Sequence, residues 1–269
     1  YPWAMQHRLQ QGGMRMHIIM ISRARIKRVL AFIGIILLLL LALLWPGHLI
    51  DAVLAGERLL PVYEVATDQQ AVSISFDASW GAERTLAILD TLDEYGVKCT
   101  FFLVNIWLED YPEMAREIAM RGHEIGLHSV SHPRFSLLSE DQIKKELADN
   151  FALVQELTGY SPSLFRPPFG DYNNRVIRVT REAGYTPIQW SIDSLDWQDL
   201  SADEICERVV RDIHAGDIVL FHNNGLHTAE ALPAILGELQ ARDLAVVPIS
   251  QLLLTGDCYI DVNGIQRRQ

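Results

Sequence analysis

The chain of 269 residues has few cysteines, and none of them has a paired spacing. Cys99, Cys206 and Cys258 form no C-x-x-C motif, so the sequence indicates neither a disulfide framework nor a thiolate metal site. We interpret these three residues as buried or spare thiols rather than nucleophiles.

Positive charge is scarce after residue 50. The whole chain carries a formal charge of −11, and residues 1–50 contain six basic and no acidic residues, so the remainder carries −17. A folded part this acidic repels phosphate at long range, and we expect no nucleic-acid partner. The segment after the first strand candidate, residues 77–81, is no glycine-rich phosphate loop, which excludes a nucleotide-binding doubly wound domain.

Charge is also absent from residues 29–50, and residues 29–45 are apolar apart from one glycine. As a helix this run rises about 25 Å, and its uncharged flank completes a bilayer span. The basic residues just before it place that end in the cytoplasm. We therefore predict a basic leader over 1–28, a transmembrane signal anchor over 29–50 and an extracytoplasmic remainder at the cell membrane. A signal peptide cleaved before Gly56 is the competing interpretation.

From residue 71 onward, short β-rich runs alternate with amphipathic helical patterns. Two helix candidates begin with capping boxes, at Ser139 and Ser201, and a glycine suited to a left-handed helix end follows five of them. This alternation predicts parallel β/α units in a barrel or a doubly wound sheet. The strand candidates are 71–77, 98–104, 124–128, 164–166, 186–192, 217–222 and 245–249, and the helix candidates are 83–95, 111–121, 139–158, 173–183, 201–214 and 228–242.

Ionisable side chains end five of the predicted strands. They are Asp77, His128, Arg166, Asp193 with Asp196 just beyond, and His222. Active sites of parallel β/α architectures are built at the carboxyl ends of strands, so this one-sided gathering indicates a catalytic site. A purely structural role would scatter such residues between both ends.

His128 and His132 stand four residues apart on the loop that leaves a strand, a spacing that lets both imidazoles contact one divalent cation. An isolated pair of this kind is more often solvated or bonded within its loop. Here Asp77 at the neighbouring strand end offers a base for water, and His222 across the barrel offers an acid for a leaving amine. The four residues together predict metal-assisted hydrolysis.

Two prolines follow Arg166 and fix the turn, which holds its guanidinium rigidly at the strand end. An inward-facing Arg166 keeps the Asp77 carboxylate ionised and oriented. The segment from Asp193 to Trp197 supplies a carboxylate for an imidazole, and Trp197 supplies an aromatic wall of the kind on which sugar rings stack. Trp80 and Trp107 are further candidate walls, although tryptophans more often lie in the core or at a rim.

Five ordered motifs carry a family resemblance, namely Ser75 to Asp77, His128 to His132, Arg166 to Gly170, Asp193 to Trp197, and Leu220 to His222. The chain from about Ala71 to Leu253 resembles the NodB-homology polysaccharide deacetylases, carbohydrate esterase family 4. It looks most like the sporulation-associated peptidoglycan deacetylases. The resemblance implies an α/β fold, a distorted (β/α) barrel with about seven parallel strands. We place this domain at 71–254, between a tether at 51–70 and a polar tail at 255–269.

The resemblance also implies a role for each matching residue. Asp77 resembles the catalytic base and Arg166 the residue that orients it. His222 resembles the general acid, and Asp196 the carboxylate that tunes that acid.

The remaining matches concern binding. His128 and His132 resemble the ligands of a divalent metal, zinc or similar. Trp197 resembles a hydrophobic wall and Leu220 the lining of an acetyl pocket. Phe169 stands where many members have tyrosine, and its backbone N–H suits an oxyanion. The implied partner is an N-acetylated glycan, peptidoglycan above all, and the sequence carries no signal for an oligomeric state.

One position departs from the family pattern. The first motif of the family usually has two successive aspartates, the second of which binds the metal, whereas Ala78 follows Asp77 here. Alanine cannot bind a cation. Two hypotheses follow: an N-deacetylase that uses water activated by Asp77, or a catalytically weak or inactive member that binds cell-wall glycan. The retained Asp77, Arg166, Asp196 and His222 favour the enzyme, because binding needs none of their proton chemistry.

Overall fold

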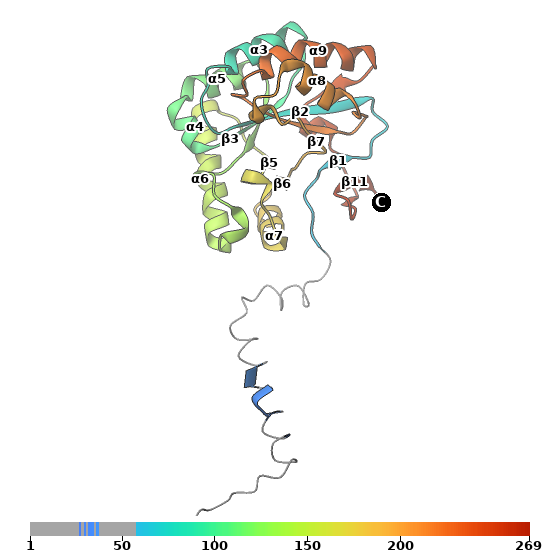
Figure 1. Cartoon of the computed structure of the whole chain (residues 1–269). Helices are drawn as coiled ribbons and strands as arrows, with labels where there is room; N and C mark the ends of the chain where they lie inside the picture. The colour runs from blue at the N-terminus through green and yellow to red at the C-terminus, as the bar shows by residue number, and fades with distance from the viewer. Residues whose placement is uncertain (1–26, 28–29, 31, 35, 38–57) are drawn as a thin grey trace, which may run out of the picture. The chain divides into compact units, whose positions relative to one another are not determined.

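A computed structural model of the chain describes residues 27, 30, 32–34, 36–37 and 58–269 (Figure 1). The predicted leader and anchor, apart from these few positions, and residues 51–57 of the predicted tether lie outside the described residues. Within the described part, no helix combines the length and the apolar composition that a bilayer span requires. Residues Arg58–Gln269 make up one unit by themselves.

A parallel sheet forms the centre of this unit. Its strands follow the order β6-β5-β4-β3-β2-β8-β7, and β9 pairs with β2 beside this row. All pairings within it are parallel, and its two edge strands, β6 and β7, are not paired with each other. The predicted α/β class with about seven parallel strands is confirmed, as a half-barrel rather than a closed one. The strands are β2 (Ala71–Ala78), β3 (Thr100–Leu103), β4 (Glu124–Leu127), β5 (Leu164–Phe165), β6 (Thr186–Pro187), β7 (Ile192–Asp193), β8 (Ile218–His222) and β9 (Ala245–Val246).

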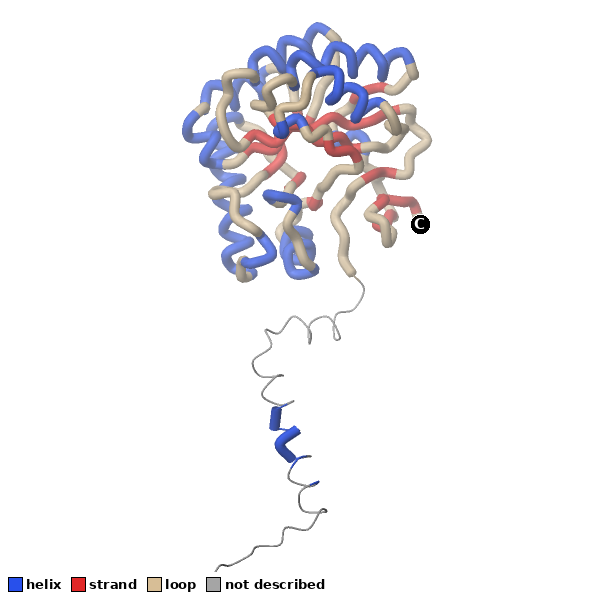
Figure 2. Tube along the Cα trace, viewed as in Figure 1, coloured by secondary structure: helices blue, strands red, loops and turns tan. Residues whose placement is uncertain are grey.

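Helices occupy the connections between consecutive strands of this sheet, except the short connection from β6 to β7 (Figure 2). Both predicted capping boxes form, with Ser139 and Ser201 each accepting from the backbone of the residue three positions on. All five glycines predicted to end helices have positive φ angles, and four of them, Gly96, Gly122, Gly159 and Gly184, lie within two residues of a helix end as predicted. The helix predicted over 201–214 ends at Val210 instead, so Gly216 lies in a turn before the next strand. The helices are α3 (Thr85–Glu94), α4 (Asn105–Asp110), α5 (Pro112–Met120), α6 (Glu140–Thr158), α7 (Asn174–Glu182), α8 (Ala202–Val210), α9 (Thr228–Ala241) and α10 (Ile249–Leu252).

The two faces of the sheet carry separate hydrophobic clusters because side chains alternate along each strand. On β3, Phe101 packs in the larger cluster beneath the helices, whereas Phe102 belongs to the smaller cluster on the opposite face. The Phe101 ring stacks on Phe76 of β2 at 4.8 Å between centroids. Because Phe76 and Ala78 both belong to the larger cluster, Ser75 and Asp77 are left on the other face of β2.

The predicted strand over 186–192 is corrected to two strands. β6 pairs with β5 and β7 pairs with β8, so these strands lie at opposite edges of the sheet. Residues 188–191 connect the two edges, and Ile188 makes a bridge with Val62 on the way. The predicted strand over 245–249 is also too long, because the chain enters α10 at Ile249.

Trp107, a candidate sugar-stacking residue, is fully buried in α4, a helix absent from the sequence prediction. Its indole Nε1 donates to the Gly81 carbonyl at 2.6 Å. Trp107 is therefore a core residue that fixes the loop after β2.

The stretches predicted as a tether and a polar tail contain strands. A three-stranded sheet has the order β1 (Glu64–Val65), β11 (Ile265–Arg268), β10 (Cys258–Ile260). β1 is parallel to β11 and also bonds to the main unit, where the Val65 N–H donates to the Gly216 carbonyl at 3.0 Å. Residues 58–70 and 255–269 therefore belong to the folded unit. Their short polar runs have too little alternation to be recognised as strands from sequence.

Gly126 of β4 is expected to tolerate no side chain. It lies in register with Phe102, and a Cβ at position 126 would lie 2.4 Å from the Phe102 ring. We expect Gly126→Ala to lower the free energy of unfolding by about 1–3 kcal/mol, the usual effect of overpacking. Urea denaturation measures this.

The matched control is Gly237→Ala within α9, where a new Cβ meets no atom within 4 Å. Alanine replaces a weak helix former there, so this variant should gain roughly 0.5–1 kcal/mol. Equal effects of the two substitutions would contradict the packing described for Phe102.

Candidate active site

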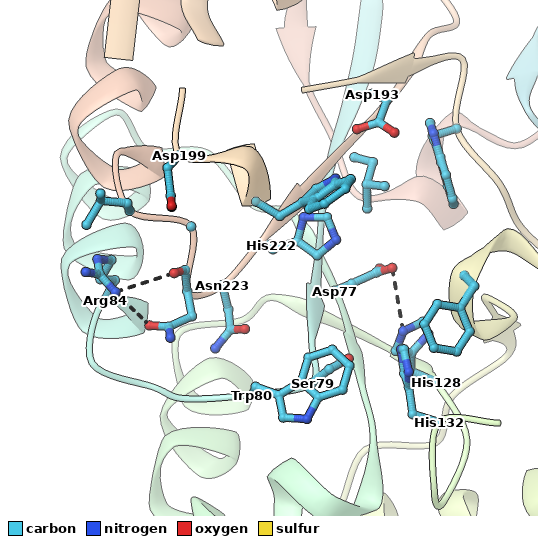
Figure 3. Close-up of a pocket in the computed structure, with 17 residues that line it drawn as sticks. Asp77, Ser79, Trp80, Arg84, His128, His132, Asp193, Asp199, His222 and Asn223 are labelled. Carbon is cyan, nitrogen blue, oxygen red and sulfur yellow. Dashed lines mark hydrogen bonds and ion pairs between the residues drawn. The ribbon is translucent and has the colours of Figure 1, made fainter. Parts of the chain in front are cut away.

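A cavity of about 690 Å³ lies at the carboxyl ends of β2, β4 and β8. Arg166 and Asp196 are fully buried behind the lining, where Arg166 bonds to Asp77 and His128 and Asp196 bonds to His222. The structure thus brings the predicted site residues to one place, at the end of the sheet where active sites of this architecture lie. The other eight predicted residues line the cavity, and they are Asp77, Trp80, His128, His132, Phe169, Trp197, Leu220 and His222 (Figure 3).

Asp77 is held by the buried guanidinium of Arg166. Arg166 Nη1 donates to Asp77 Oδ1 at 2.8 Å. Its Nη2 donates to Ser75 Oγ at 2.8 Å and to the Gln189 carbonyl at 3.0 Å. The guanidinium carbon lies 4.2 Å from the centroid of the Phe102 ring. These contacts fix the orientation of the guanidinium. The guanidinium in turn orients the Asp77 carboxylate.

The electrostatics of Asp77 favour its ionised form. Burial alone raises the pKa of this carboxyl group, but the positive charge of Arg166, with smaller contributions from His128 and His222, outweighs it. The net effect lowers the pKa below its ordinary value of 3.8. Asp77 is therefore a carboxylate at neutral pH and can accept a proton.

Two neutral imidazoles lie beside Asp77. His128 Nδ1 is 2.8 Å from the Arg166 carbonyl, and since a carbonyl only accepts, Nδ1 carries the proton. The other ring nitrogen of His128, Nε2, lies 3.6 Å from Asp77 Oδ2 with its lone pair free. Burial lowers the pKa of His128, and burial together with the charge of His128 lowers the pKa of His132 to about 4. Both rings therefore offer a lone pair at neutral pH.

Two side chains of α6 that the sequence analysis missed hold the loop that carries these histidines. Asn150 Oδ1 accepts from the backbone N–H groups of His128 and Ser129 at 2.8 and 3.0 Å. Glu146 Oε2 accepts from the Val130 N–H at 2.7 Å. Glu146 and Asn150 are four residues apart, which places them on one face of the helix. The sequence did carry one sign of this contact. Asn150 lies among the apolar residues on the buried face of α6, where a polar side chain needs a hydrogen-bond partner.

His222 is oriented by Asp196. Its Nδ1 donates to Asp196 Oδ1 at 2.7 Å, while Asp196 Oδ2 accepts from the His222 N–H at 2.8 Å and from Thr228 Oγ1 at 2.6 Å. Burial lowers the pKa of His222, but the hydrogen bond and charge of Asp196, together with the charges of Asp77 and Asp193, outweigh it. The net pKa is raised above 6.5. His222 is thus suited to hold a proton at neutral pH.

The placement of His222 across the barrel from Asp77 is corrected. The two residues are register partners on the neighbouring strands β8 and β2. Residues paired across adjacent parallel strands point to the same face, about 5 Å apart. The carboxylate and the imidazole therefore lie side by side in the cavity and can act on one bound group.

Apolar side chains form the walls of the cavity. Trp80, Trp197 and Phe169 line it with 61%, 58% and 58% of their surface exposed, whereas Leu220 is 3% exposed and lies at its base. Exposed aromatic rings beside a polar cavity suit the faces of sugar rings. The Phe169 backbone has a φ of 60°, a left-handed conformation that is strained for this residue. Such strain is typical of functional loops.

The donor set fits a divalent cation through two ligands and lacks a third. His128 is tied to a backbone carbonyl as ligating histidines usually are. The buried Nδ1 of His132 has no hydrogen-bond partner among the residues that the structure describes. Ala78 is fully buried in the hydrophobic cluster behind β2 and does not line the cavity. Asp77, the nearest carboxylate, already pairs with Arg166.

Among the residues that the structure describes, another group of potential ligands lies outside the cavity. The ligand atoms of Glu64, His214 and Asp217 are within 4.8 Å of one another. Both ring nitrogens of His214 already face carboxylates there, at 2.7 Å from Asp217 and 3.4 Å from Glu64. Asp217 precedes β8, so this group lies at the other end of that strand from His222.

Comparison with known proteins gives consistent matches. The family model for polysaccharide deacetylase matches residues 64–188. A peptidoglycan-N-acetylglucosamine deacetylase of Bacillus cereus is 32% identical over 196 residues, which are 71% of this chain and 92% of that protein. The Bacillus subtilis protein YlxY is 31% identical over 193 residues, or 72% of this chain, and the match spans 60% of its own length.

Solved structures give the same picture. The crystal structure of a CE4 family pseudoenzyme from Bacillus anthracis is 31% identical, with a TM-score of 0.69 over 71% of this chain and 68% of that one. A mutant of that pseudoenzyme with restored enzymatic activity is 32% identical, again with a TM-score of 0.69, over 71% of this chain and 70% of that one.

Proposed function

The chain belongs to the polysaccharide deacetylases of carbohydrate esterase family 4, which are hydrolases, and we propose that it removes acetyl groups from N-acetylated sugars of peptidoglycan. The observation that carries this proposal is the pairing of Asp77 and His222 in one cavity, each with its own buried partner. One group is poised to take a proton and the other to give one, which amide hydrolysis requires.

In the proposed reaction, Asp77 takes a proton from a water molecule at Oδ2, because Oδ1 is occupied by Arg166. The water oxygen attacks the acetyl carbonyl, whose methyl group lies against Leu220. The Phe169 backbone N–H donates to the oxyanion. His222 then protonates the departing amine from Nε2, since Nδ1 is held by Asp196. Trp80 and Trp197 bind the sugar rings, and acetate and a free amine are the products.

The family typically depends on a metal, and His128 and His132 are the residues that would hold one here. A divalent cation bound to them would lower the pKa of a water molecule and polarise the acetyl carbonyl. The roles of Asp77, Arg166, Asp196 and His222 in orienting groups and moving protons are set by their own contacts.

A catalytically weak or inactive glycan-binding protein is the second candidate function. Its support is the burial of Ala78 where the family usually has a ligand, together with the likeness to a pseudoenzyme. The complete proton-transfer set makes hydrolysis the better-supported proposal.

For the N-terminal part we propose the signal anchor over 29–50, with the catalytic domain outside the cytoplasmic membrane. The apolar run and the basic cluster before it support this proposal. If the mature protein begins at Gly56, the segment is instead a signal peptide that is cleaved off. The likeness to sporulation-associated members stays a prediction, which the timing of expression tests.

The first test of the function is acetate release. The folded protein, with added zinc, is expected to release acetate from N-acetylated peptidoglycan or from chitin oligomers. Asp77→Asn removes the base and should lower the rate by roughly 10²–10⁴-fold. Asp68→Asn, the same change at an exposed position, is the control. Glycan binding by the folded protein without acetate release under any divalent metal would favour the glycan-binding alternative.

A second test concerns position 78. We expect Ala78→Asp to raise zinc affinity in a metal titration, because the family usually has a metal-binding aspartate at this position. Without metal, a carboxylate at this fully buried position should lower the urea midpoint. Added zinc should restore the midpoint through binding to the native state.

The control for this variant is Ala78→Asn, which has the same size but no charge. It should be destabilised without any recovery by zinc. If Ala78→Asp stays destabilised at all zinc concentrations, the new side chain remains in the hydrophobic cluster and position 78 cannot serve the cavity.

The pH dependence follows from the two opposite pKa shifts. His222 works protonated, and its raised pKa keeps the activity up to a pH above 6.5. Asp196→Asn removes the negative charge and weakens the hydrogen bond, so the pKa of His222 falls. The alkaline limb of kcat/KM should therefore move to lower pH, while the acidic limb, set by Asp77, stays in place. Asp199→Asn is the control, since Asp199 lines the cavity without contacting His222; an equal shift in both variants would contradict the proposed role of Asp196.

A further inference from the structure

Arg84 is a cation of the cavity that the proposed reaction does not use. It lies in the loop between β2 and α3 and is partly buried in the cavity lining. Its Nη1 donates to the carbonyl and to Oδ1 of Asn224, at 3.4 and 3.2 Å, which joins the loop after β2 to the loop after β8 (Figure 3). Figure 3 shows it on the other side of Asp77 and His222 from the two histidines.

The charge of Arg84 has no carboxylate partner within the described part of the chain. Its two hydrogen bonds both go from Nη1 to the neutral Asn224, so they involve only one of the three guanidinium nitrogens. By contrast, the buried Arg166 has Asp77, and the surface residues Arg116 and Arg178 have glutamate partners. Asp193 and Asp199 line the same cavity, but neither lies within 4.0 Å of the guanidinium. Arg84 is therefore positioned by a neutral contact, and its remaining donors have no partner among the described residues.

We propose that Arg84 binds a carboxylate of the substrate, and that it directs the enzyme to sugars that carry an acidic substituent beside the acetamido group. The inference rests on the proposed deacetylase function. A guanidinium presents parallel N–H groups that match the two oxygens of a carboxylate. In N-acetylmuramic acid, the lactyl ether is attached to the carbon next to the one that bears the acetamido group. With the acetamido group at Asp77 and His222, the lactyl group lies one ring position away, toward one wall of the cavity.

The recognised carboxylate has two chemical sources in peptidoglycan. It is either the free acid of the lactyl group or an acid of the peptide that is attached through that group. N-acetylglucosamine has neither. Arg84 is a positioning and specificity residue in this proposal, because it contacts the substituent and not the reacting atoms.

Three oligosaccharides of equal length test the proposal. One contains N-acetylglucosamine alone, one alternates it with N-acetylmuramic acid that has free lactyl groups, and one carries the peptides. Acetate release gives KM and kcat, and calorimetric titration gives Kd independently of turnover. The variants are Arg84→Gln, Arg84→Lys, and Arg116→Gln as a matched loss of charge at an exposed arginine outside the cavity. Thermal unfolding checks that each variant is folded.

Arg84→Gln should raise KM and Kd for a carboxylate-bearing oligomer by roughly 10- to 100-fold, the range expected for a lost charge-assisted hydrogen bond. Its kcat, and its KM for the N-acetylglucosamine oligomer, should change little. Arg84→Lys keeps the charge and should recover part of the affinity, and Arg116→Gln should match the unaltered protein. An effect confined to the peptide-bearing oligomer supports recognition of a peptide acid, and an effect on the free lactyl oligomer supports recognition of the lactyl acid.

Equal weakening of all three oligomers by Arg84→Gln would overturn the proposal, as would equal affinity of the unaltered protein for oligomers with and without carboxylates. Absence of acetate release from every oligomer by the unaltered protein would instead count against the deacetylase function, and the Kd values would still decide the role of Arg84.

Discussion

The site depends on one buried ion pair, Arg166 with Asp77. A guanidinium removed from water is unfavourable unless its N–H groups find acceptors and its charge finds a partner. The two terminal nitrogens of Arg166 obtain both from Asp77, Ser75 and the Gln189 carbonyl, whereas its buried Nε has no hydrogen-bond partner among the described residues. The ring of Phe102 fills the space beside it, and that ring fits only because position 126 on the next strand has no side chain. The packing of Phe102 against Gly126 on β4, two strands away from β2, therefore helps to set the direction of the Asp77 carboxylate.

The same pair limits the chemistry of Asp77. A neighbouring positive charge keeps the carboxylate ionised, but it also makes the carboxylate a weaker proton acceptor. His222, its register partner, has the opposite shift, because Asp196 stabilises its protonated form. Neighbouring groups with opposite shifts are an established arrangement for dividing the acid and base roles. Arg166 therefore fixes the ionisation and direction of Asp77, but it does not strengthen it as a base.

Much of this was predictable from the sequence because its signals were local. The ends of β2, β4 and β8, the capping boxes at Ser139 and Ser201, and the glycines after the helices each depend on short stretches of chain, and the structure has them. Features that depend on distant contacts were missed or misplaced. Residues 186–192 are divided between two sheet edges because they pair with β5 and with β8. The hydrogen bonds of Glu146 and Asn150 to the loop that carries the histidines depend on how α6 packs. The direction of Ala78 follows from strand alternation at a position where the family pattern suggested a ligand.

The small sheet of β1, β11 and β10 changes where this domain begins and ends. β11 comes from the last residues of the chain, and β1 lies ahead of the first long strand. Through Val65 and Gly216, β1 is bonded to the segment that leads into β8, the strand that carries His222. A recombinant fragment trimmed to residues 71–254 would omit both partners of this pairing, and it would also remove Val62, the bridge partner of the buried Ile188. Preparations for crystallisation or assay should therefore keep residues 58–269 together.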